Sequence, residues 1–322
     1  MATPSSVFTE MVSTTLRHSA TDVTDNVSDH NALLRKIKAK GKIKTVSGGY
    51  EAQEPLEYAE NSTYTRYAGL DTLNTNASDV ITSAKYDWAQ VAIHVVASGR
   101  ELRMNSGKEQ MINLVKTRKS NAMKTAANNF SIDLYSDGSL TNQIGGLANI
   151  IQTNGQGTVG GINSTTWTFW RNKFREMTGT NAYTAATIQG EFGAMWLPLV
   201  RGADKPDLIV ASHDIYSVYE GSLEQNMRYT STKDGEAGFS SLKYKTADVI
   251  FDDNTNFTTT AEKAYFLNTD YLYLVQHKEA QWTADDEKKP INQDAVVVPM
   301  YWMGYLAATN RALQGVLIDA AA

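Results

Sequence analysis

The sequence SGKEQMINLVKTRKSNAMKTAANNFSIDLYSDG, residues 106–138, contains the longest uninterrupted helical pattern in the chain. Apolar residues recur in it at steps of three and four, which places them on one helix face. They are Met111, Leu114, Val115, Ala122, Met123, Ala126, Phe130 and Leu134. Basic residues lie on or beside the other face, namely Lys108, Lys116, Arg118, Lys119 and Lys124. Ser106 and Glu109 form a capping-box pattern, and Gly138 marks the expected end. One long helix in an otherwise β-rich chain favours a flat, elongated subunit over a compact enzyme.

The composition is that of an ordinary soluble globular protein. Of 322 residues, 42% are hydrophobic and 20% are charged. The net charge of −5 argues against nucleic-acid binding by the molecule as a whole, so any such contact needs a local basic surface. The chain has no cysteine, which excludes disulfides, thiolate metal sites and cysteine nucleophiles.

The sequence offers no signal for secretion or for a membrane. The first residues, MATPSSVFTE, have neither a basic region nor an apolar core of the kind that a signal peptide needs. The longest nearly apolar run, residues 296–308, contains Pro299 and Gly304 and is too short to span a bilayer. We therefore expect synthesis and folding in a cytoplasm, without membrane contact.

The N-terminal region divides into a polar segment and a basic one. Residues 1–34 are rich in Ser, Thr and Asp, and their scattered apolar positions predict an arm with a short helix. In residues 36–44, lysines alternate with Ile, Ala and Gly, and this period of two predicts a strand with one basic edge. A merely solvated, charged strand is an equal alternative.

Residues 45–84 have the opposite charge and contain no lysine. Their only basic residue is Arg66. Six acids stand in this stretch: Glu51, Glu54, Glu57, Glu60, Asp71 and Asp79. Pro55 argues against a helix, so we predict a long two-stranded hairpin that returns through residues 80–97. Such a ribbon is marginal alone in water, and this one is too polar to have a core of its own, so it needs a partner surface.

The remainder of the chain mixes helices and strands without a regular βαβ rhythm, which predicts an α+β fold. Helices are expected over residues 167–177 and 188–199, and again after Ser212 as N-cap. Strands are expected over residues 207–211, 249–251, 264–275, 295–303 and 306–318.

No motif assembles a catalytic or metal site. The glycine cluster GTVGGI, residues 157–162, lacks the Lys-Ser/Thr ending of a phosphate loop and predicts a tight turn. The five histidines lack metal-ligand spacing, and His213-Asp214 is expected to open a helix. Asp252-Asp253 and Asp285-Asp286-Glu287 are expected to be loop acids. We therefore expect no enzyme, no cofactor and no metal.

Several short motifs follow one another in a characteristic order over residues 45–318. They are QIGGLANII (143–151), GTVGGI (157–162), WRN (170–172), PDLIVAS (206–212), FSSLKYKTADVIFDD (239–253), YFLNTDYLYLVQH (265–277), NQD (292–294) and GYLAATNRALQGVL (304–317). None is diagnostic alone. Their order, with the basic helix and the acidic hairpin, resembles that of the major capsid proteins of tailed bacteriophages, which share the Hong Kong 97-type fold.

The resemblance implies an α+β Hong Kong 97-type fold in four parts. They are an N-terminal arm (1–44), an extended loop across an adjacent subunit (45–97), a peripheral domain (98–144 and 256–322) with the spine helix 106–138, and an axial domain (145–255). The implied function is that of a major capsid protein that assembles into the icosahedral head shell around phage double-stranded DNA. Alternatives are an encapsulin-type nanocompartment, an enzyme with an unrecognised site, and a β-rich adhesin or tail component, against which the long helix argues.

The implied partners are other copies of the chain in hexamers and pentamers, a portal, a separate scaffolding protein and a cement or decoration protein. The implied location is the virion, after assembly in the host cytoplasm. Some relatives join their subunits through a lysine in the extended loop. Because this loop has no lysine before Lys85, we expect a shell without covalent cross-links.

Two sets of residues are candidates for contact in such a shell. The first set, for intersubunit contact, is Glu51, Glu54, Glu57 and Arg66. The second set, for a non-specific lining toward packaged DNA, is Arg35, Lys36, Lys38, Lys40, Lys42, Lys44, Lys116, Lys119 and Lys124. The alternative for these cations is pairing with acids of a neighbouring subunit or of a scaffold.

Overall fold

The structure is a computed structural model that describes residues 32–49, 51–104, 114–177, 184–223, 242–252, 262–284 and 286–319. The short helix expected in the N-terminal arm lies outside these ranges, as do Ser106 and Glu109 of the expected capping box. The described residues divide into two compact units. Within them, no helix is long and apolar enough to cross a membrane.

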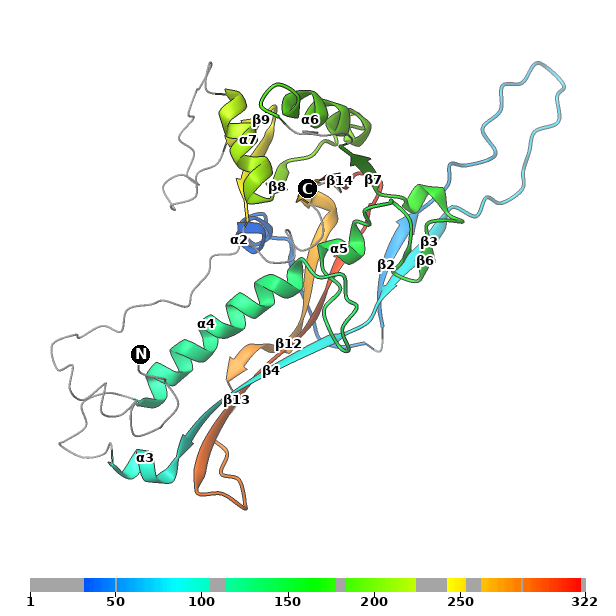
Figure 1. Cartoon of the computed structure of the whole chain (residues 1–322). Coiled ribbons are helices and arrows are strands. Elements are labelled where there is room, and N and C mark those ends of the chain that lie inside the picture. Colours follow the sequence, from blue (N-terminus) through cyan, green and yellow to red (C-terminus); the bar gives the residue numbers. More distant parts are fainter. Residues whose placement is uncertain are drawn as a thin grey trace. The chain divides into compact units, whose positions relative to one another are not determined.

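The larger unit contains Ala32–Ala89, Ile132–Lys278 and the residues from Gly304 onward, and its centre is a six-stranded sheet (Figure 1). The strand order is β7 (Lys173–Glu176), β14 (Gly315–Asp319), β11 (Glu262–Leu267), β8 (Leu208–Ala211), β10 (Ala247–Phe251) and β9 (Leu242–Tyr244). The central strand β8 pairs in parallel with β10 and antiparallel with β11. All four of its side chains are buried, as the apolar run LIVA predicts.

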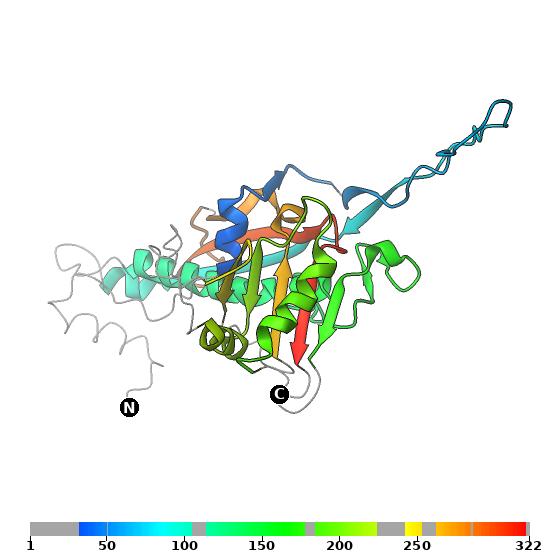
Figure 2. The same ribbon diagram turned by 90° about the horizontal axis from the view of Figure 1, so that it is seen from above.

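Two helices pack on this sheet, α6 (Ile188–Trp196) and α7 (His213–Leu223) (Figure 2). The ring of Phe192 on α6 stacks on Tyr219 of α7 at 4.9 Å and meets Phe266 of β11 edge-on at 5.3 Å. Helix α6 confirms the helix expected over 188–199, whose last residues form the 3₁₀ turn η3 (Leu197–Leu199). Helix α7 begins directly after Ser212, as predicted.

A four-stranded sheet has the order β1 (Ile43–Val46), β12 (Leu272–Ala284), β13 (Ala295–Ala308) and β4 (Ala89–Ser98). Strands β12 and β13 contribute residues to both units. In the smaller unit, Gln90–Ser131 and Glu279–Met303, the core joins this sheet to α4 (Leu114–Leu134). Its buried residues include Val95, Ala122, Val298 and Met300.

The buried face of α4 is in part the one that the sequence predicts, because Met123 of that predicted face is 37% exposed. Ala122, Ala126, Phe130 and Leu134 recur at steps of four and are all buried. The ring of Phe130 meets Trp302 of β13 at 4.7 Å. The helix ends four residues before Gly138, because the amides after Leu134 bond three residues back, at 3.1 Å, and tighten the last turn.

Two short ribbons complete the larger unit: β2 (Ala52–Glu57) with β3 (Ile81–Tyr86), and β5 (Thr158–Val159) with β6 (Ile162–Asn163). The other short elements are α2 (Ala32–Ala39), α3 (Gly99–Met104), α5 (Leu147–Ile150), η2 (Thr168–Trp170) and η5 (Thr269–Tyr271). The expected hairpin therefore forms, but it returns through β3 alone, since β4 belongs to the four-stranded sheet.

The strand expected over residues 36–44 is wrong. The first half is helix α2, in which Leu33 and Ile37, one turn apart, are both buried. Gly41, with φ +65°, ends this segment, and β1 begins at Ile43. The lysines therefore do not share one strand edge.

The helix expected over residues 167–177 is also wrong. A single 3₁₀ turn, η2, suffices to bury Trp170, whose indole N–H donates to the carbonyl of Val159 at 2.9 Å. The following residues form β7, which pairs in parallel with β14.

Two expected strands are each divided in two. The strand over residues 264–275 is interrupted at Asn268, whose side chain accepts a hydrogen bond from the amide of Asp270 at 3.2 Å and caps η5. The strand over residues 306–318 consists of the end of β13 and of β14, with a turn between them.

Candidate functional site

The hairpin of β2 and β3 is a two-stranded sheet of its own within the larger unit. Its strands pair antiparallel from Ala52 opposite Tyr86 to Glu57 opposite Ile81, and the amide of Tyr58 extends the pairing. Pro55 stands within β2, which a two-stranded ribbon tolerates because each strand is an edge.

The base of the hairpin is held by ion pairs within the chain. The Lys44 ammonium lies 3.1 Å from the Glu54 carboxylate and 3.9 Å from the centre of the Tyr273 ring. The Lys85 ammonium lies 3.3 Å from Glu51. Two of the acids expected to contact a neighbour therefore have a basic partner in their own chain.

The other two candidates for intersubunit contact lie further along the hairpin. Glu57 and Arg66 are both exposed, and neither forms an ion pair within the described part of the chain. Whether they contact a neighbouring subunit stays a prediction.

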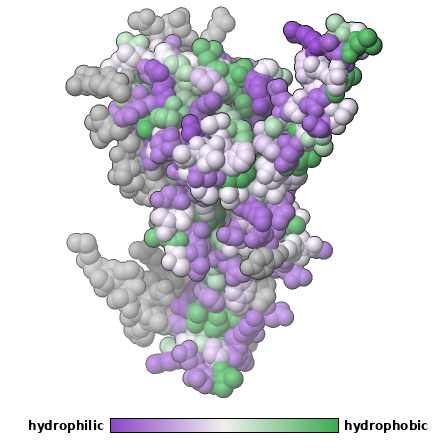
Figure 3. Space-filling view, turned by 90° about the vertical axis from the view of Figure 1, so that its right-hand side faces the viewer, coloured by the Kyte–Doolittle hydropathy of each residue, from purple (hydrophilic) through white to green (hydrophobic). Residues whose placement is uncertain are grey.

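The end of the hairpin exposes apolar side chains. Tyr64 is 82% exposed, Tyr67 65% and Leu70 104%, while Leu73 is 47% exposed. The end of the hairpin, at the upper right of Figure 3, carries apolar and hydrophilic residues next to each other. A surface that combines exposed tyrosines, leucine and an arginine has the composition of an interface.

The β5–β6 turn confirms the tight turn predicted from GTVGGI, and it contacts the hairpin. Gly160 and Gly161 have φ of +60° and +74°, as a two-residue turn between antiparallel strands requires. The carbonyl of Gly160 accepts a hydrogen bond from the amide of Lys85 at 2.9 Å. A Cβ on Gly160 would lie 2.8 Å from the Cβ of Ala84, so only glycine allows this close approach.

A buried arginine joins three of the motifs that carry the family resemblance. Arg311 has no exposed surface. Its Nε donates to the carbonyl of Ile150 at 2.6 Å, and its Nη2 donates to Oδ1 of Asn172 at 3.1 Å. The guanidinium lies 5.9 Å from the centre of the Trp170 ring. Burial lowers the pKa of Arg311 to about 10, because the guanidinium loses its contact with water.

Four of the lysines that were candidates for a DNA-facing lining form ion pairs within the larger unit. The pairs are Lys36 with Asp248, Lys40 with Asp207, Lys42 with Asp270 and Lys44 with Glu54. Their charges are therefore largely compensated by the chain itself.

The other candidates for that lining are dispersed. Lys38 is exposed on α2, and Lys119 is exposed on α4. Arg35 and Lys124 are half-buried, and the structure does not describe the side chain of Lys116. Which of these residues face DNA stays a prediction.

The smaller unit contains an ion pair that the sequence did not reveal. The Glu101 carboxylate, on α3, is 3% exposed and accepts two hydrogen bonds from Arg118 of α4, at 2.9 and 3.1 Å. Arg118 also donates to the carbonyl of Val96 at 2.9 Å. The hydrogen bonds from Arg118 lower the pKa of Glu101.

The acids and histidines considered for catalysis or metal binding do not converge. His213 opens α7, as predicted, and lies exposed beside Asp214 at 3.5 Å. Asp252 follows the last residue of β10, as a loop acid should, but it is buried and its carboxylate accepts a hydrogen bond from the Tyr135 hydroxyl at 2.8 Å. Asp253 and Asp285 lie outside the described residues. Nowhere in the described ranges do three potential metal ligands gather.

Comparison with known proteins finds chains of similar fold among solved structures of phage capsids and of an encapsulin. No protein-family model and no curated protein sequence matches it. Among solved structures, the capsid of cyanophage A-1(L) matches with a TM-score of 0.62 and 14% identity, over 92% of this chain and 95% of that one. The capsid of the Myoviridae phage XM1 matches with a TM-score of 0.62 and 11% identity, over 95% and 97%.

A third match is the SrpI encapsulin complex of Synechococcus elongatus, with a TM-score of 0.57 and 9% identity, over 96% of this chain and 94% of that one. These similarities extend over almost the whole length of both chains in each comparison. The chain therefore has the α+β Hong Kong 97-type fold of phage capsid proteins, as the order of its motifs predicted.

Proposed function

We propose that this protein is a major capsid protein, which assembles into the icosahedral head shell around the double-stranded DNA of a tailed bacteriophage. The observation that carries the proposal is the match to capsid structures over more than nine tenths of both chains. A fold shared with shell subunits also accounts for three features of the hairpin. Ion pairs fix its base, few of its side chains are buried, and its end exposes apolar side chains. Each hairpin is completed by a neighbouring copy.

In this proposal the chain is a structural component of the virion and not an enzyme. Its first partner is a second copy, within hexamers and pentamers. The family resemblance adds a portal, a scaffolding protein and a decoration protein as further partners. Among the candidates for contact with packaged DNA, the exposed Lys38 and Lys119 are favoured over the lysines that pair within the chain.

The encapsulin match supports a second candidate, a protein-filled nanocompartment. The two functions differ in what the shell encloses. A phage head holds nucleic acid, and its particles absorb at 260 nm and release DNA when they are disrupted. A nanocompartment holds protein.

The test is to express the chain and examine it by sedimentation and negative-stain electron microscopy. We expect closed shells or aberrant particles, and a 35.5 kDa species that stays monomeric at high concentration, both with and without its phage partners, would contradict the proposal. Denaturing electrophoresis of the particles should give one band at the monomer mass, because the only lysine of the paired hairpin strands, Lys85, pairs with Glu51 at the base. The contents of particles purified from infected cells distinguish the two candidate functions.

A further inference from the structure

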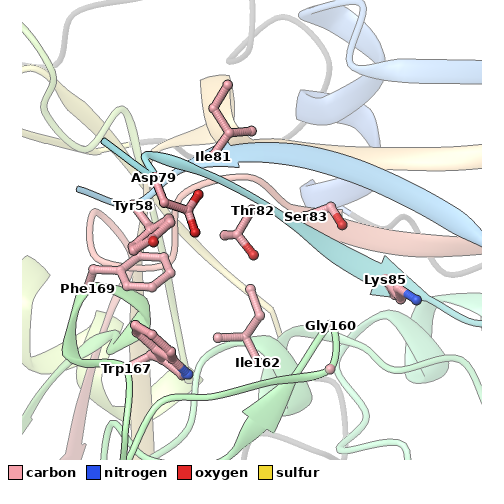
Figure 4. A pocket seen from close by; sticks show the side chains of 11 residues that line it. Tyr58, Asp79, Ile81, Thr82, Ser83, Lys85, Gly160, Ile162, Trp167 and Phe169 are labelled. Carbon is pink, nitrogen blue, oxygen red and sulfur yellow. The ribbon is translucent and has the colours of Figure 1, made fainter. Parts of the chain in front are cut away.

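A cavity of about 360 Å³ lies between the hairpin and the β5–β6 turn, within the larger unit (Figure 4). Strand β3 forms one wall with Thr82. Tyr58, at the end of β2, and the segment around η2 form the other wall. The cavity is open to solvent, since Trp167 on its rim is 49% exposed.

Three aromatic rings line one end of this cavity. The ring centre of Tyr58 lies 5.8 Å from that of Trp167 and 5.7 Å from that of Phe169, and the last two rings are 6.4 Å apart. Aromatic faces carry partial negative charge and attract a cation, most strongly where water is partly excluded. We call Tyr58, Trp167 and Phe169 the aromatic cage.

A carboxylate completes this end of the cavity. Figure 4 shows Asp79 beside Tyr58, and partial burial together with the charge of Asp79 raises the pKa of the Tyr58 hydroxyl. The one basic side chain of the lining, Lys85, pairs with Glu51 at 3.3 Å. The cage therefore presents three rings and one acid, a combination that fits a cationic side chain.

We propose that the aromatic cage receives the guanidinium of Arg66 from a second copy of the chain. Arg66 is the only basic residue between positions 45 and 84. It is exposed and forms no ion pair in the part of the chain that the structure describes. Arginine can stack on aromatic rings and donate two hydrogen bonds to one carboxylate. A cage of three rings beside Asp79 allows both interactions.

Arg66 does not line the cavity of its own chain. Arg66 stands eight positions after Tyr58. The loop between β2 and β3 extends away from the β5–β6 turn (Figures 1 and 2). An extended segment of this length spans about 25 Å. The exposed neighbours Tyr64 and Tyr67 would reach the receiving subunit together with Arg66. This inference rests on the proposed function, since it needs copies that assemble.

A disulfide test uses the absence of cysteine from the natural chain. In the double variant Arg66→Cys with Thr82→Cys, mild oxidation of purified particles should produce a ladder of disulfide-linked multimers. The matched control is Arg66→Cys with Thr153→Cys, since Thr153 is exposed and does not line the cavity. Equal ladders, or no ladder, in the two variants would overturn the assignment.

An energetic test compares Arg66→Gln, Asp79→Asn and the double variant by the concentration at which shells form. Each single change should raise that concentration about 5- to 30-fold, and the double variant should go little further because both remove one interaction. Arg66→Lys keeps the charge and should fall in between. Fully additive effects would show that the two residues do not meet.

The outcomes separate this inference from the proposed function. A natural chain that forms no particles, even when its phage partners are present, refutes the proposed function. The cage assignment is overturned if the natural chain forms particles and neither Arg66→Gln nor Asp79→Asn changes the concentration at which shells form. The proposed function is not affected by that result. Sensitivity to Asp79→Asn alone overturns Arg66 as the occupant.

Discussion

Replacing Arg311 is the sharpest test of how the larger unit is held together. The side chain is fully buried and joins Ile150, Asn172 and Trp170 from segments more than a hundred residues away. Arg311→Met keeps most of the volume but removes the charge and both hydrogen bonds. Arg311→Lys keeps the charge but loses the planar fork.

The magnitude follows from two opposing terms. Each hydrogen bond from a charged donor stabilises by about 1.5–3 kcal/mol, so two contribute about 3–6 kcal/mol. Against this, burial lowers the pKa of Arg311 from 12.5 to about 10, which corresponds to a cost of about 3 kcal/mol for keeping it charged. Arg311→Met should therefore lower the free energy of unfolding by about 1–2 kcal/mol. Arg311→Lys should lower it by at least as much, because it keeps the burial cost and loses at least one hydrogen bond.

The assay is urea unfolding of the unassembled chain, followed by tryptophan fluorescence. Arg201→Met is the matched control, because the Arg201 side chain is 67% exposed and its change should stay within about 0.5 kcal/mol. A variant Arg311→Met as stable as the natural chain would refute the reasoning, since the hydrogen bonds would then contribute nothing net. The reasoning would also be refuted if Arg311→Lys were as stable as the natural chain while Arg311→Met were less stable, because the positive charge alone would then be sufficient for stability.

Three further changes test other parts of the structure. Glu54→Gln breaks an ion pair at the hairpin base and should speed proteolysis of the hairpin severalfold, whereas Glu57→Gln, at an exposed position, should leave the rate unchanged. Arg118 lowers the pKa of Glu101 in the folded state. The stability that Glu101 contributes is therefore present above its unfolded pKa near 4.5 and is lost as the pH falls through its lower folded pKa. In Glu101→Gln, the free energy of unfolding should depend less steeply on pH in this acid range. Gly160→Ala should lower the unfolding free energy by about 1–3 kcal/mol, through its positive φ and its contact with the hairpin, and an unchanged thermal midpoint would contradict the tight turn.

The elements with one dominant periodicity could be predicted from the sequence. The spacing of apolar residues predicted that α4 exists and that Ala122, Ala126, Phe130 and Leu134 are buried, although Met123 of the same predicted face is exposed. A continuous run of apolar residues predicted the buried strand β8. In these segments local pattern and tertiary packing agree, so no long-range information was needed.

The basic stretch shows where this reasoning fails. In residues 36–44, lysines alternate with small or apolar residues, and that alternation fits a strand. A second pattern, Leu33 with Ile37, fits a helix, and packing selects it because both side chains become buried. Period-two and period-four patterns coexist in a short segment, and only the rest of the fold decides between them.

The candidate site could be predicted in part. The acids of the hairpin were found, but the lysines that pair with Glu51 and Glu54 depend on strand register and on where β1 lies. The aromatic cage joins Tyr58 to Trp167, more than a hundred residues apart. Residue spacing in the sequence does not predict a contact over such a distance along the chain. It also does not predict that Arg311 is buried.

If the proposed function is correct, the pairing of these acids within the chain changes which side chains of the hairpin should stabilise the assembly. The sequence predicted that charged residues of the hairpin contact a neighbouring subunit, yet two of them, Glu51 and Glu54, already have partners in the chain. A remaining exposed ion pair contributes only about 0–1 kcal/mol. Burying a leucine-sized side chain contributes about 1.5–3 kcal/mol, and the end of the hairpin exposes Tyr64, Tyr67 and Leu70. Desolvation of these side chains therefore outweighs the charges as the driving force, while the charges and the single arginine fix where the hairpin docks.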